Sequence, residues 1–314
     1  MRYYFAPMEG LTDSIYRRLH HEFFPGITRY YTPFISPTVH RHLTPREQRE
    51  LPPAESVGFP VVPQILTKNP EDCLWLARQC RDLGYREVNL NLGCPSGTVT
   101  AKGKGAGMLA DPEGLDRFLE AVYTDAPLDI SVKTRIGFTD PGEFPRLLEI
   151  YNRYPIRELT VHPRVRSVFY KGAVDMDAVQ HAFDNSRAPV CFNGNLCSAA
   201  QIRMLQDRFP QVEAVMLGRG LIGDPAMLCP DSRTPAKLEQ FHDTLLEAYT
   251  EAFGSARNAM FRMKENWCYM IRNFSDSDRL YKQLRKTTDL AQFKQITREI
   301  FRTCPLEKEL AADW

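Results

Sequence analysis

Residues 87–112 read EVNLNLGCPSGTVTAKGKGAGMLADP. The first six residues are typical of a buried strand, the middle is rich in glycine and lysine, and the final Asp-Pro is a common helix start. The stretch therefore predicts one strand–loop–helix unit. Its single cysteine, Cys94, directly follows the strand. At that place a cysteine is a packing residue, a metal ligand or a reactive group at the mouth of a site.

The bulk composition is that of a globular protein with a large core. The chain has 314 residues, 43% of them hydrophobic, a charged fraction of 25% and a net charge of +1. Near-neutral charge is typical of small-molecule enzymes, so any nucleic-acid-binding surface must be local. The N-terminal MRYYFAPMEGLTD is no secretory signal, and no apolar run approaches the length of a membrane span. We expect a cytoplasmic monomer that does not bind membranes.

The cysteines show no metal-binding or disulfide pattern. They form no CxxC pair and have no histidine cluster at zinc spacing, and they are Cys73, Cys80, Cys94, Cys191, Cys197, Cys229, Cys268 and Cys304. We expect free thiols, no metal site, and packing roles for all of them except Cys94.

Short apolar runs rich in Val, Ile and Tyr alternate with amphipathic segments. The predicted strands are residues 3–7, 27–34, 61–66, 87–92, 129–136, 158–162, 189–194 and 214–220. Among the predicted helices are 70–84 and 111–123, each with its apolar residues on one face or an Asp-Pro start. Eight strands alternating with helices predict a TIM (β/α)8 barrel, with a doubly wound sheet as the alternative.

The pattern changes after Asp224-Pro225. Residues 230–235, PDSRTP, resemble a linker, and from Ala236 onward the sequence shows only helical periodicity. We therefore expect a barrel domain over residues 1–229 and an all-α helical domain over residues 230–314.

In a (β/α)8 barrel the active groups lie at the C-terminal ends of the strands. The last two predicted strands end in Asn193-Gly194-Asn195 and Gly218-Arg219-Gly220. Glycine allows close backbone approach to an anion, and the arginine adds positive charge. Such turns also occur as ordinary strand–helix connections, but both together at these two strands favour a phosphate site.

Three polar side chains lie on the other strands. A lysine is rarely buried without a partner, and Lys133 would find one in an electron-rich ligand. Gln64 offers a donor and an acceptor to the edge of a heterocycle, and His162 ends another strand. Together with a phosphate site, they predict a phosphorylated planar cofactor such as FMN, whose negative charge Lys133 would stabilise.

The segment after Cys94 could be a mobile loop that covers a substrate. Its glycine spacing does not match a dinucleotide-binding fingerprint. Lys102 and Lys104 would suit a polyanion, although two solvated loop lysines are the simpler interpretation of that fragment.

The motifs together resemble the tRNA-dihydrouridine synthase family. They are APMEGLTD (6–13), NLGCP (91–95), SVKTRIG (131–137), HPR (162–164), NGN (193–195) and GRG (218–220). The combination of APMEG and NxGCP in this order is specific, and FRMKENWCYMI (261–271) is similar to that family's RNA-binding helical domain. The resemblance therefore covers nearly the whole chain.

The resemblance implies an FMN flavoprotein, reduced by NADPH, that converts uridine in RNA, most often tRNA, to 5,6-dihydrouridine. The implied cofactor contacts are Pro7, Met8, Gln64, Lys133, His162, Asn193, Gly194, Asn195, Gly218 and Arg219. Asn91 and Arg164 would meet the target uracil, and Cys94 would be the general acid. Reducing the C5=C6 bond needs a hydride at C6 and a proton at C5, and a thiol is protonated at neutral pH.

Three positions depart from the usual family pattern: Asn89 where an acidic residue is frequent, NGN instead of NGD or NGE, and HPR instead of HGR. The helical tail also carries basic residues, namely Arg257, Arg262, Lys264, Arg272, Arg279, Lys282, Arg285 and Lys286. We expect a basic stripe for RNA phosphates among them, while most of the interleaved aromatic residues belong to the core.

Two other functions remain open at this point. A different FMN-barrel oxidoreductase, similar to dihydroorotate dehydrogenase, would act on a small pyrimidine or an enone and would leave the helical tail unexplained. A protein that binds RNA without chemistry would not need Cys94, Lys133 and His162. The same reaction on ribosomal RNA is a further alternative.

Overall fold

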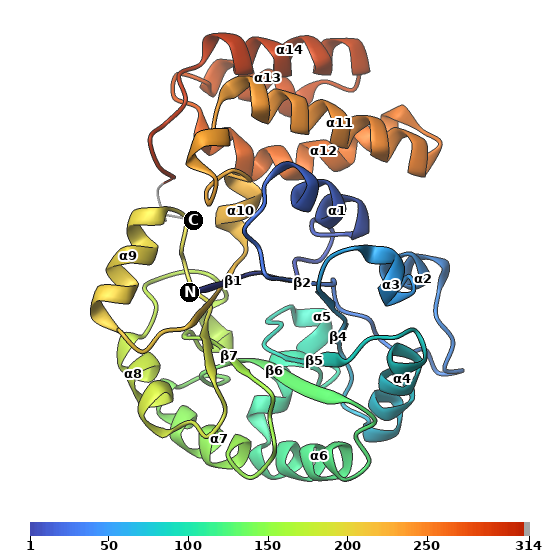
Figure 1. Cartoon of the computed structure of the whole chain (residues 1–314), viewed down its shortest axis with the longest axis vertical. Coiled ribbons are helices and arrows are strands. Elements are labelled where there is room, and N and C mark those ends of the chain that lie inside the picture. Colours follow the sequence, from blue (N-terminus) through green and yellow to red (C-terminus); the bar gives the residue numbers. More distant parts are fainter. Residues whose placement is uncertain (311–314) are drawn as a thin grey trace.

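The computed structural model describes residues 1–310, and its centre is a parallel sheet curled into a barrel (Figure 1). Within these residues, nine strands follow one another in the order β3-β2-β1-β9-β8-β7-β6-β5-β4, and every pair is parallel. The strands are β1 (Arg2–Phe5), β2 (Arg29–Tyr31), β3 (Val61–Val62), β4 (Gln64–Ile65), β5 (Glu87–Leu92), β6 (Asp129–Arg135), β7 (Leu159–His162), β8 (Val190–Phe192) and β9 (Ala214–Leu217).

Pro63 divides the third barrel position into two short strands. β3 pairs with β2 and β4 pairs with β5, while Pro63, which has no N–H to donate, accepts a bond from the Asn89 amide at 2.8 Å. A parallel bridge between Ile35, in the segment after β2, and Ile65 of β4 closes the barrel. The predicted (β/α)8 barrel is therefore confirmed, the doubly wound alternative is wrong, and the predicted strand 61–66 is two strands.

Helices surround the strands as an outer ring (Figure 1). They are α1 (Ser14–Phe23), α2 (Pro45–Glu50), α3 (Ala54–Val57), α4 (Pro70–Asp82), α6 (Pro112–Thr124), α7 (Phe144–Tyr151), α8 (Met176–Asn185), α9 (Ala199–Arg208) and α10 (Arg219–Gly223). Helix α5 (Gly97–Thr100) lies inside the ring beside β5 (Figure 1). Short 3-10 turns are η1 (Gly105–Ala110), η2 (Pro141–Glu143), η3 (Arg166–Val168) and η4 (Pro230–Ser232). Asn69 caps α4 by accepting a bond from the Asp72 amide, as Asp111 caps α6 through the Gly114 amide.

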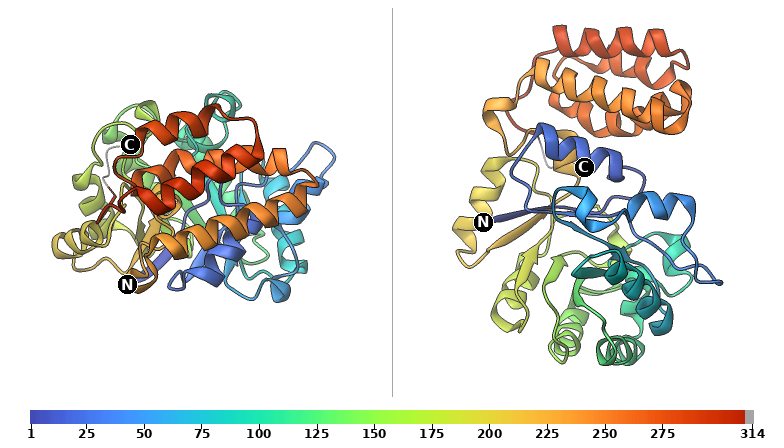
Figure 2. Two further views of the ribbon diagram at one scale, coloured as in Figure 1. Left: turned by 90° about the horizontal axis from the view of Figure 1, so that it is seen from above. Right: turned by 45° about the vertical axis from the view of Figure 1, so that its right-hand side comes forward.

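The C-terminal helices form a layer on one side of the barrel, next to α1 and α10 (Figures 1 and 2). They are α11 (Pro235–Phe253), α12 (Ala256–Met270), η5 (Ile271–Asn273), α13 (Asp278–Lys286) and α14 (Leu290–Thr303). One hydrophobic cluster runs from the barrel into this layer. At the boundary the Phe241 ring lies 5.6 Å from Tyr16 and 5.3 Å from Phe24, measured between ring centroids.

Among residues 1–310, no helix has the length and apolar character that crossing a membrane requires. The same residues contain no group of three or more His, Cys, Asp or Glu side chains placed to hold a metal ion. The cysteines are free thiols.

The shared core predicts that the two parts of the chain unfold together. Phe241→Ala removes a fully buried ring that contacts α1, and we expect a loss of about 3–5 kcal/mol in the free energy of unfolding. Urea denaturation followed by tryptophan fluorescence and far-UV circular dichroism measures this loss, and one common transition is expected.

The matched control is Phe261→Ala, because Phe261 belongs to the same helical layer but is 40% exposed. A change below about 1 kcal/mol is expected there. Separate transitions for barrel and helical layer would contradict the shared core.

Candidate active site

A cavity of about 480 Å³ lies at the C-terminal ends of the strands. Its wall contains these residues predicted from the sequence: Pro7, Met8, Gln64, Asn91, Cys94, Lys133, His162, Asn193, Gly194, Asn195, Gly218 and Arg219. Arg164, the remaining one, lies buried behind His162 and Asn195. The fold thus brings together residues that are as far as 212 positions apart, from Pro7 to Arg219.

A chain of buried amide groups crosses the floor of the cavity. Gln64 on β4 donates through Nε2 to Asn89 Oδ1 at 2.8 Å and accepts through Oε1 from Asn91 Nδ2 at 2.8 Å. Asn89 in turn donates to the Ser131 hydroxyl at 3.0 Å. Asn89 therefore lies beneath Gln64 and holds its amide in one orientation.

The same chain of hydrogen bonds ends at the cysteine. Asn91 Oδ1 accepts from the backbone N–H groups of Gly93 at 3.1 Å and Cys94 at 2.9 Å. On the other side, the Cys94 carbonyl accepts from the Ala106 amide, and an added Cβ at Gly105, whose φ is +57°, would lie 3.0 Å from the Cys94 Cβ. Strand β5 and the glycine-rich segment therefore both fix the backbone of Cys94.

The glycine-lysine segment is folded against the site. It forms α5 and η1, Ala106 and Met108 are buried, and Arg166 Nη2 donates to the Thr100 hydroxyl at 3.0 Å. In this structure the segment is a folded support packed against the Cys94 loop, and the cavity lining in this part of the chain is Gly93, Cys94 and Pro95.

Burial and positive charge set the protonation of the site. Burial raises the pKa of the Cys94 thiol above its ordinary value, although Arg135 and Lys133 oppose the shift. Burial, helped by Arg135, lowers the pKa of Lys133 to about 8. Burial and the charges of Arg135, Lys133, Arg164 and Arg219 also lower the pKa of His162 far below its ordinary value. At neutral pH the site therefore has a neutral imidazole, a protonated thiol and an ammonium group whose charged form is destabilised by burial.

Two buried arginines position the loops around the cavity. Arg135 donates to the carbonyl of Gly93 at 2.8 Å and to that of Phe169 at 2.6 Å. Arg164 donates to the Gly172 carbonyl at 2.5 Å, to Asn195 Oδ1 at 3.3 Å and to the imidazole of His162 at 3.2 Å. The role of Arg135 had no signal in the sequence, because its partners lie in two other loops.

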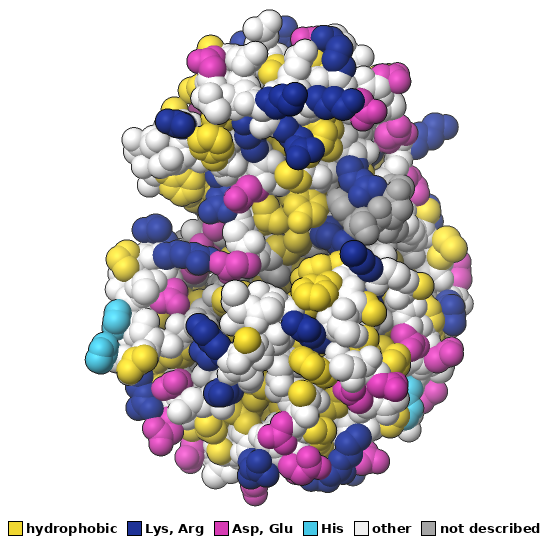
Figure 3. All heavy atoms as spheres, turned by 180° about the vertical axis from the view of Figure 1, so that it is seen from behind, with side chains coloured by type: hydrophobic (Ala, Val, Ile, Leu, Met, Phe, Trp, Pro, Cys, Tyr) yellow, Lys and Arg dark blue, Asp and Glu magenta, His cyan; other side chains and the backbone are white. Residues whose placement is uncertain are grey.

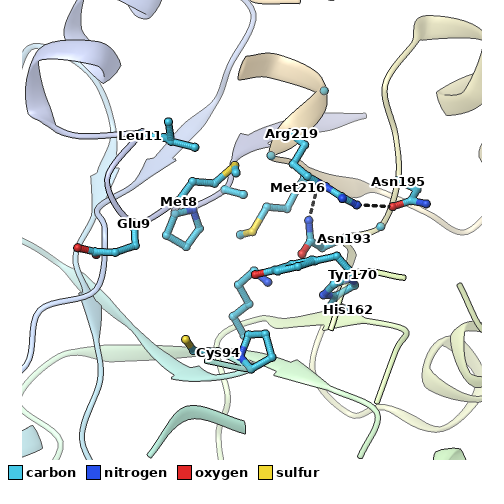
Figure 4. A pocket seen from close by; sticks show the side chains of 18 of the residues that line it. Met8, Glu9, Leu11, Cys94, His162, Tyr170, Asn193, Asn195, Met216 and Arg219 are labelled. Atoms are coloured by element: carbon cyan, nitrogen blue, oxygen red, sulfur yellow. Dashed lines mark hydrogen bonds between the residues drawn. The ribbon is translucent and has the colours of Figure 1, made fainter. Parts of the chain in front are cut away.

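The ends of β8 and β9 form a second, cationic end of the cavity (Figure 4). Arg219 donates to Asn195 Oδ1 at 2.8 Å, and Asn195 has a φ of +45°. The backbone is crowded here: an added Cβ at Gly194 would lie 2.9 Å from Val174 Cγ1, and one at Gly218 would lie 3.2 Å from Met8 Sδ. Glycine at these positions is favoured by packing, because a Cβ would press against these side chains. The phosphate site expected from the two turns stays a prediction.

Three further residues of the wall were missed by the sequence analysis: Tyr170, Tyr269 and Arg272. Tyr170 lies beside His162, with ring centroids 6.1 Å apart and planes 26° from parallel (Figure 4). The guanidinium carbons of Arg135 and Arg219 are each 5.2 Å from its ring centroid. Tyr170 belongs to an irregular loop without periodicity, and the other two belong to the helical layer.

Comparisons with known proteins agree with this geometry. The family model described as dihydrouridine synthase (Dus) matches residues 4–309. A tRNA-dihydrouridine synthase B of Pasteurella multocida is 26% identical over 225 residues, covering 71% of this chain and 67% of its own. A tRNA-dihydrouridine(16) synthase of Pseudomonas putida is 28% identical over 308 residues, covering 93% of this chain and 94% of its own.

The likeness to solved structures concerns the fold alone. A structure of histamine dehydrogenase from Rhizobium sp. 4-9 matches with a TM-score of 0.52 and 12% identity, covering 77% of this chain and 46% of that one.

The raised pKa of Cys94 predicts slow alkylation at neutral pH. Because only the thiolate reacts, modification by iodoacetamide should stay slow at pH 7 and accelerate above pH 9, the ordinary value that burial raises. Peptide mass spectrometry measures the rate, with exposed Cys268 as the internal control for reagent access. Fast alkylation of Cys94 already at pH 6 would reveal a thiolate and contradict the prediction.

The lowered pKa of Lys133 predicts a pH-dependent stability. The pKa is 10.5 ordinarily and about 8 in the folded protein, so between these values the unfolded state binds more protons and stability rises with pH. Lys133→Met lacks this contribution. In urea denaturation without added ligands, the variant should be the more stable at pH 7, and its advantage should shrink from about pH 8 upward. If the stability difference between the two proteins did not change with pH, the pKa of Lys133 would not be lowered in the folded protein, and the prediction would be wrong.

Proposed function

The chain belongs to the dihydrouridine synthase (Dus) family, and we propose that it reduces specific uridines in tRNA to 5,6-dihydrouridine. The relatives in Pasteurella multocida and Pseudomonas putida are named for this reaction on tRNA. The observation that carries the proposal is the position of the Cys94 side chain, which lines the same cavity as Lys133 and Arg219. Because tRNA modification takes place in the cytoplasm, we place the enzyme there.

The residues of the cavity fit FMN as the cofactor. Gly194, Gly218 and Arg219 offer close backbone approach and positive charge to a phosphate. Lys133 is a partly buried ammonium group that lines the cavity, and an anionic ligand beside it would raise its pKa from about 8. Bound FMN, reduced by NADPH, would supply the hydride for C6 of the uracil.

The remaining contacts to the cofactor follow from the same wall. Pro7 and Met8, which follow β1, belong to this wall. The Met8 N–H group donates to the Thr12 hydroxyl at 2.8 Å. Gln64 and His162 would face the ring and the ribityl chain. Since burial and nearby cations keep His162 neutral, its imidazole can act as a hydrogen-bond donor or acceptor without repelling the cationic neighbours.

Cys94 would hold the proton that C5 of the uracil receives. Its thiol is protonated at neutral pH because burial raises its pKa, and its backbone is fixed by Asn91 at the cavity wall. As the C5–H bond forms, the S–H electron pair stays on sulfur, and solvent returns a proton to the thiolate afterwards. A serine hydroxyl would be a much weaker acid at the same place.

The two predicted uracil contacts have different surroundings. Asn91 lines the cavity next to Cys94, and we propose that it faces the base. Arg164 is buried and bonded to Gly172, Asn195 and His162, so a direct contact would break those bonds. We propose that Arg164 acts instead by positioning the loop that borders the base. The base must leave its stack to enter the cavity, which costs least in an RNA loop.

We propose that residues 230–314 bind the body of the RNA. On the face shown in Figure 3, lysines and arginines gather over the helical layer and beside the hollow between it and the barrel. Some of the predicted basic residues serve the fold instead: Arg262 donates to the Gly10 carbonyl, and Lys264 to the Thr287 carbonyl. Exposed Arg257, Lys282 and Lys286 remain available for RNA phosphates.

Cys94→Ala tests the proposal. Loss of the proton donor should lower the rate of dihydrouridine formation by about 10²-fold or more, while NADPH still reduces the bound flavin and tRNA still binds. tRNA from a deletion strain is incubated with each protein. Mass spectrometry of its dihydrouridine content before and after this treatment gives the rate. The control is Cys268→Ala, which changes an exposed thiol in the helical layer and should leave all three properties unaltered. Full activity of the Cys94 variant, or no dihydrouridine from the unaltered enzyme, would refute the proposal.

A further inference from the structure

The helical layer contributes part of the cavity wall. Tyr269 at the end of α12 and Arg272 in η5 line it together with Asn195 and Arg219 of the barrel. Both side chains are partly buried. A region expected to bind RNA therefore also reaches the cationic end of the cavity.

The neighbour of Arg272 anchors it to the barrel. Asn273 is fully buried, and its Nδ2 donates to the Gly223 carbonyl at the end of α10 at 2.5 Å. Its Oδ1 accepts from Arg233 at 3.2 Å, and Arg233 also bonds to buried Asp224 at 2.5 Å. These bonds fix η5 against α10, the helix that begins with Arg219.

Arg272 and Arg219 are close enough for their charges to interact. Burial lowers the pKa of Arg219, and the charge of Arg272 lowers it further. Two guanidinium groups held beside one cavity are stabilised by a ligand that carries negative charge there. Guanidinium groups also match phosphate oxygens in geometry, because each can donate two parallel hydrogen bonds.

We propose that Arg272 is a second phosphate-binding arginine, which acts with Arg219 on the phosphate monoester of the flavin cofactor. The inference rests on the proposed function, since it takes FMN as the cofactor. The cofactor is favoured over an RNA phosphodiester because Arg272 lines the same cavity as Arg219 and the turns of Gly194 and Gly218, where the sequence predicts the cofactor phosphate. The helical layer is then needed to hold the cofactor, in addition to any part in holding RNA.

The test compares FMN with riboflavin, which lacks the phosphate. Flavin is removed from the full-length protein, and each ligand is titrated back while its fluorescence is followed. For Arg272→Gln, the Kd for FMN should rise about tenfold or more, as expected for the loss of a charge-assisted hydrogen bond, and the Kd for riboflavin should not change. Arg219→Gln should show the same selective loss.

Two further variants serve as controls. Arg272→Lys retains the charge and should keep part of the preference for FMN over riboflavin. Arg302→Gln removes an exposed arginine of α14 and should bind both flavins as the unaltered protein does. Thermal unfolding of every variant shows whether it is folded, and the ratio of the two dissociation constants does not depend on the amount of folded protein.

The outcomes separate the sources of phosphate. An unchanged Kd for FMN in Arg272→Gln overturns the inference, and so does an equal loss of FMN and riboflavin affinity. If FMN binding is unchanged while the FMN-loaded variant binds tRNA more weakly, Arg272 contacts RNA phosphates and the inference is also wrong. Dihydrouridine formation is measured separately, so failure of the proposed reaction leaves the flavin comparison interpretable.

Discussion

Buried amide groups must have their donors and acceptors satisfied, and this requirement organises the mouth of the barrel. Gln64 lies between Asn89 and Asn91 and bonds to both, so three neighbouring strands are tied at one level by side chains as well as by their backbones. The last acceptor in the chain, Asn91 Oδ1, bonds to the backbone of Cys94. The place of the thiol therefore follows from strand register. Loss of any of these amides would leave a buried polar partner unsatisfied, at a cost of about 1–3 kcal/mol.

A second organising feature is positive charge in a protein whose net charge is only +1. Arg135 and Arg164 use their guanidinium hydrogens on loop carbonyls and neighbouring side chains, but their charges still act on the cavity. Burial and these charges, together with those of Lys133 and Arg219, lower the pKa of His162 and keep it neutral. A local field of this kind favours an anionic ligand at the cavity without making the whole surface attractive to polyanions.

The sequence was sufficient for the barrel and for twelve of the residues that line the cavity, because both depend on local patterns. Alternating strands end in polar or glycine residues, and the barrel rule brings those ends to one face. The division at Pro63 could have been predicted, since proline interrupts a strand. The role of Arg135 could not, because its partners Gly93 and Phe169 come from loops whose paths are set by tertiary packing. Tyr170 likewise reaches His162 from a loop without periodicity.

The contacts between the barrel and the helical layer would determine how a bound RNA is oriented at the cavity. Phe241 packs into α1, Arg262 donates to the Gly10 carbonyl, and Tyr249 donates to Asp13 at 3.1 Å. These contacts fix the layer on the loop that follows β1, which itself borders the cavity. A tRNA bound to a layer held this firmly would meet the cavity in one orientation. The uridine within reach of Cys94 would then be chosen by the distance from the docking surface to the cavity, which explains why no short motif encodes the target position.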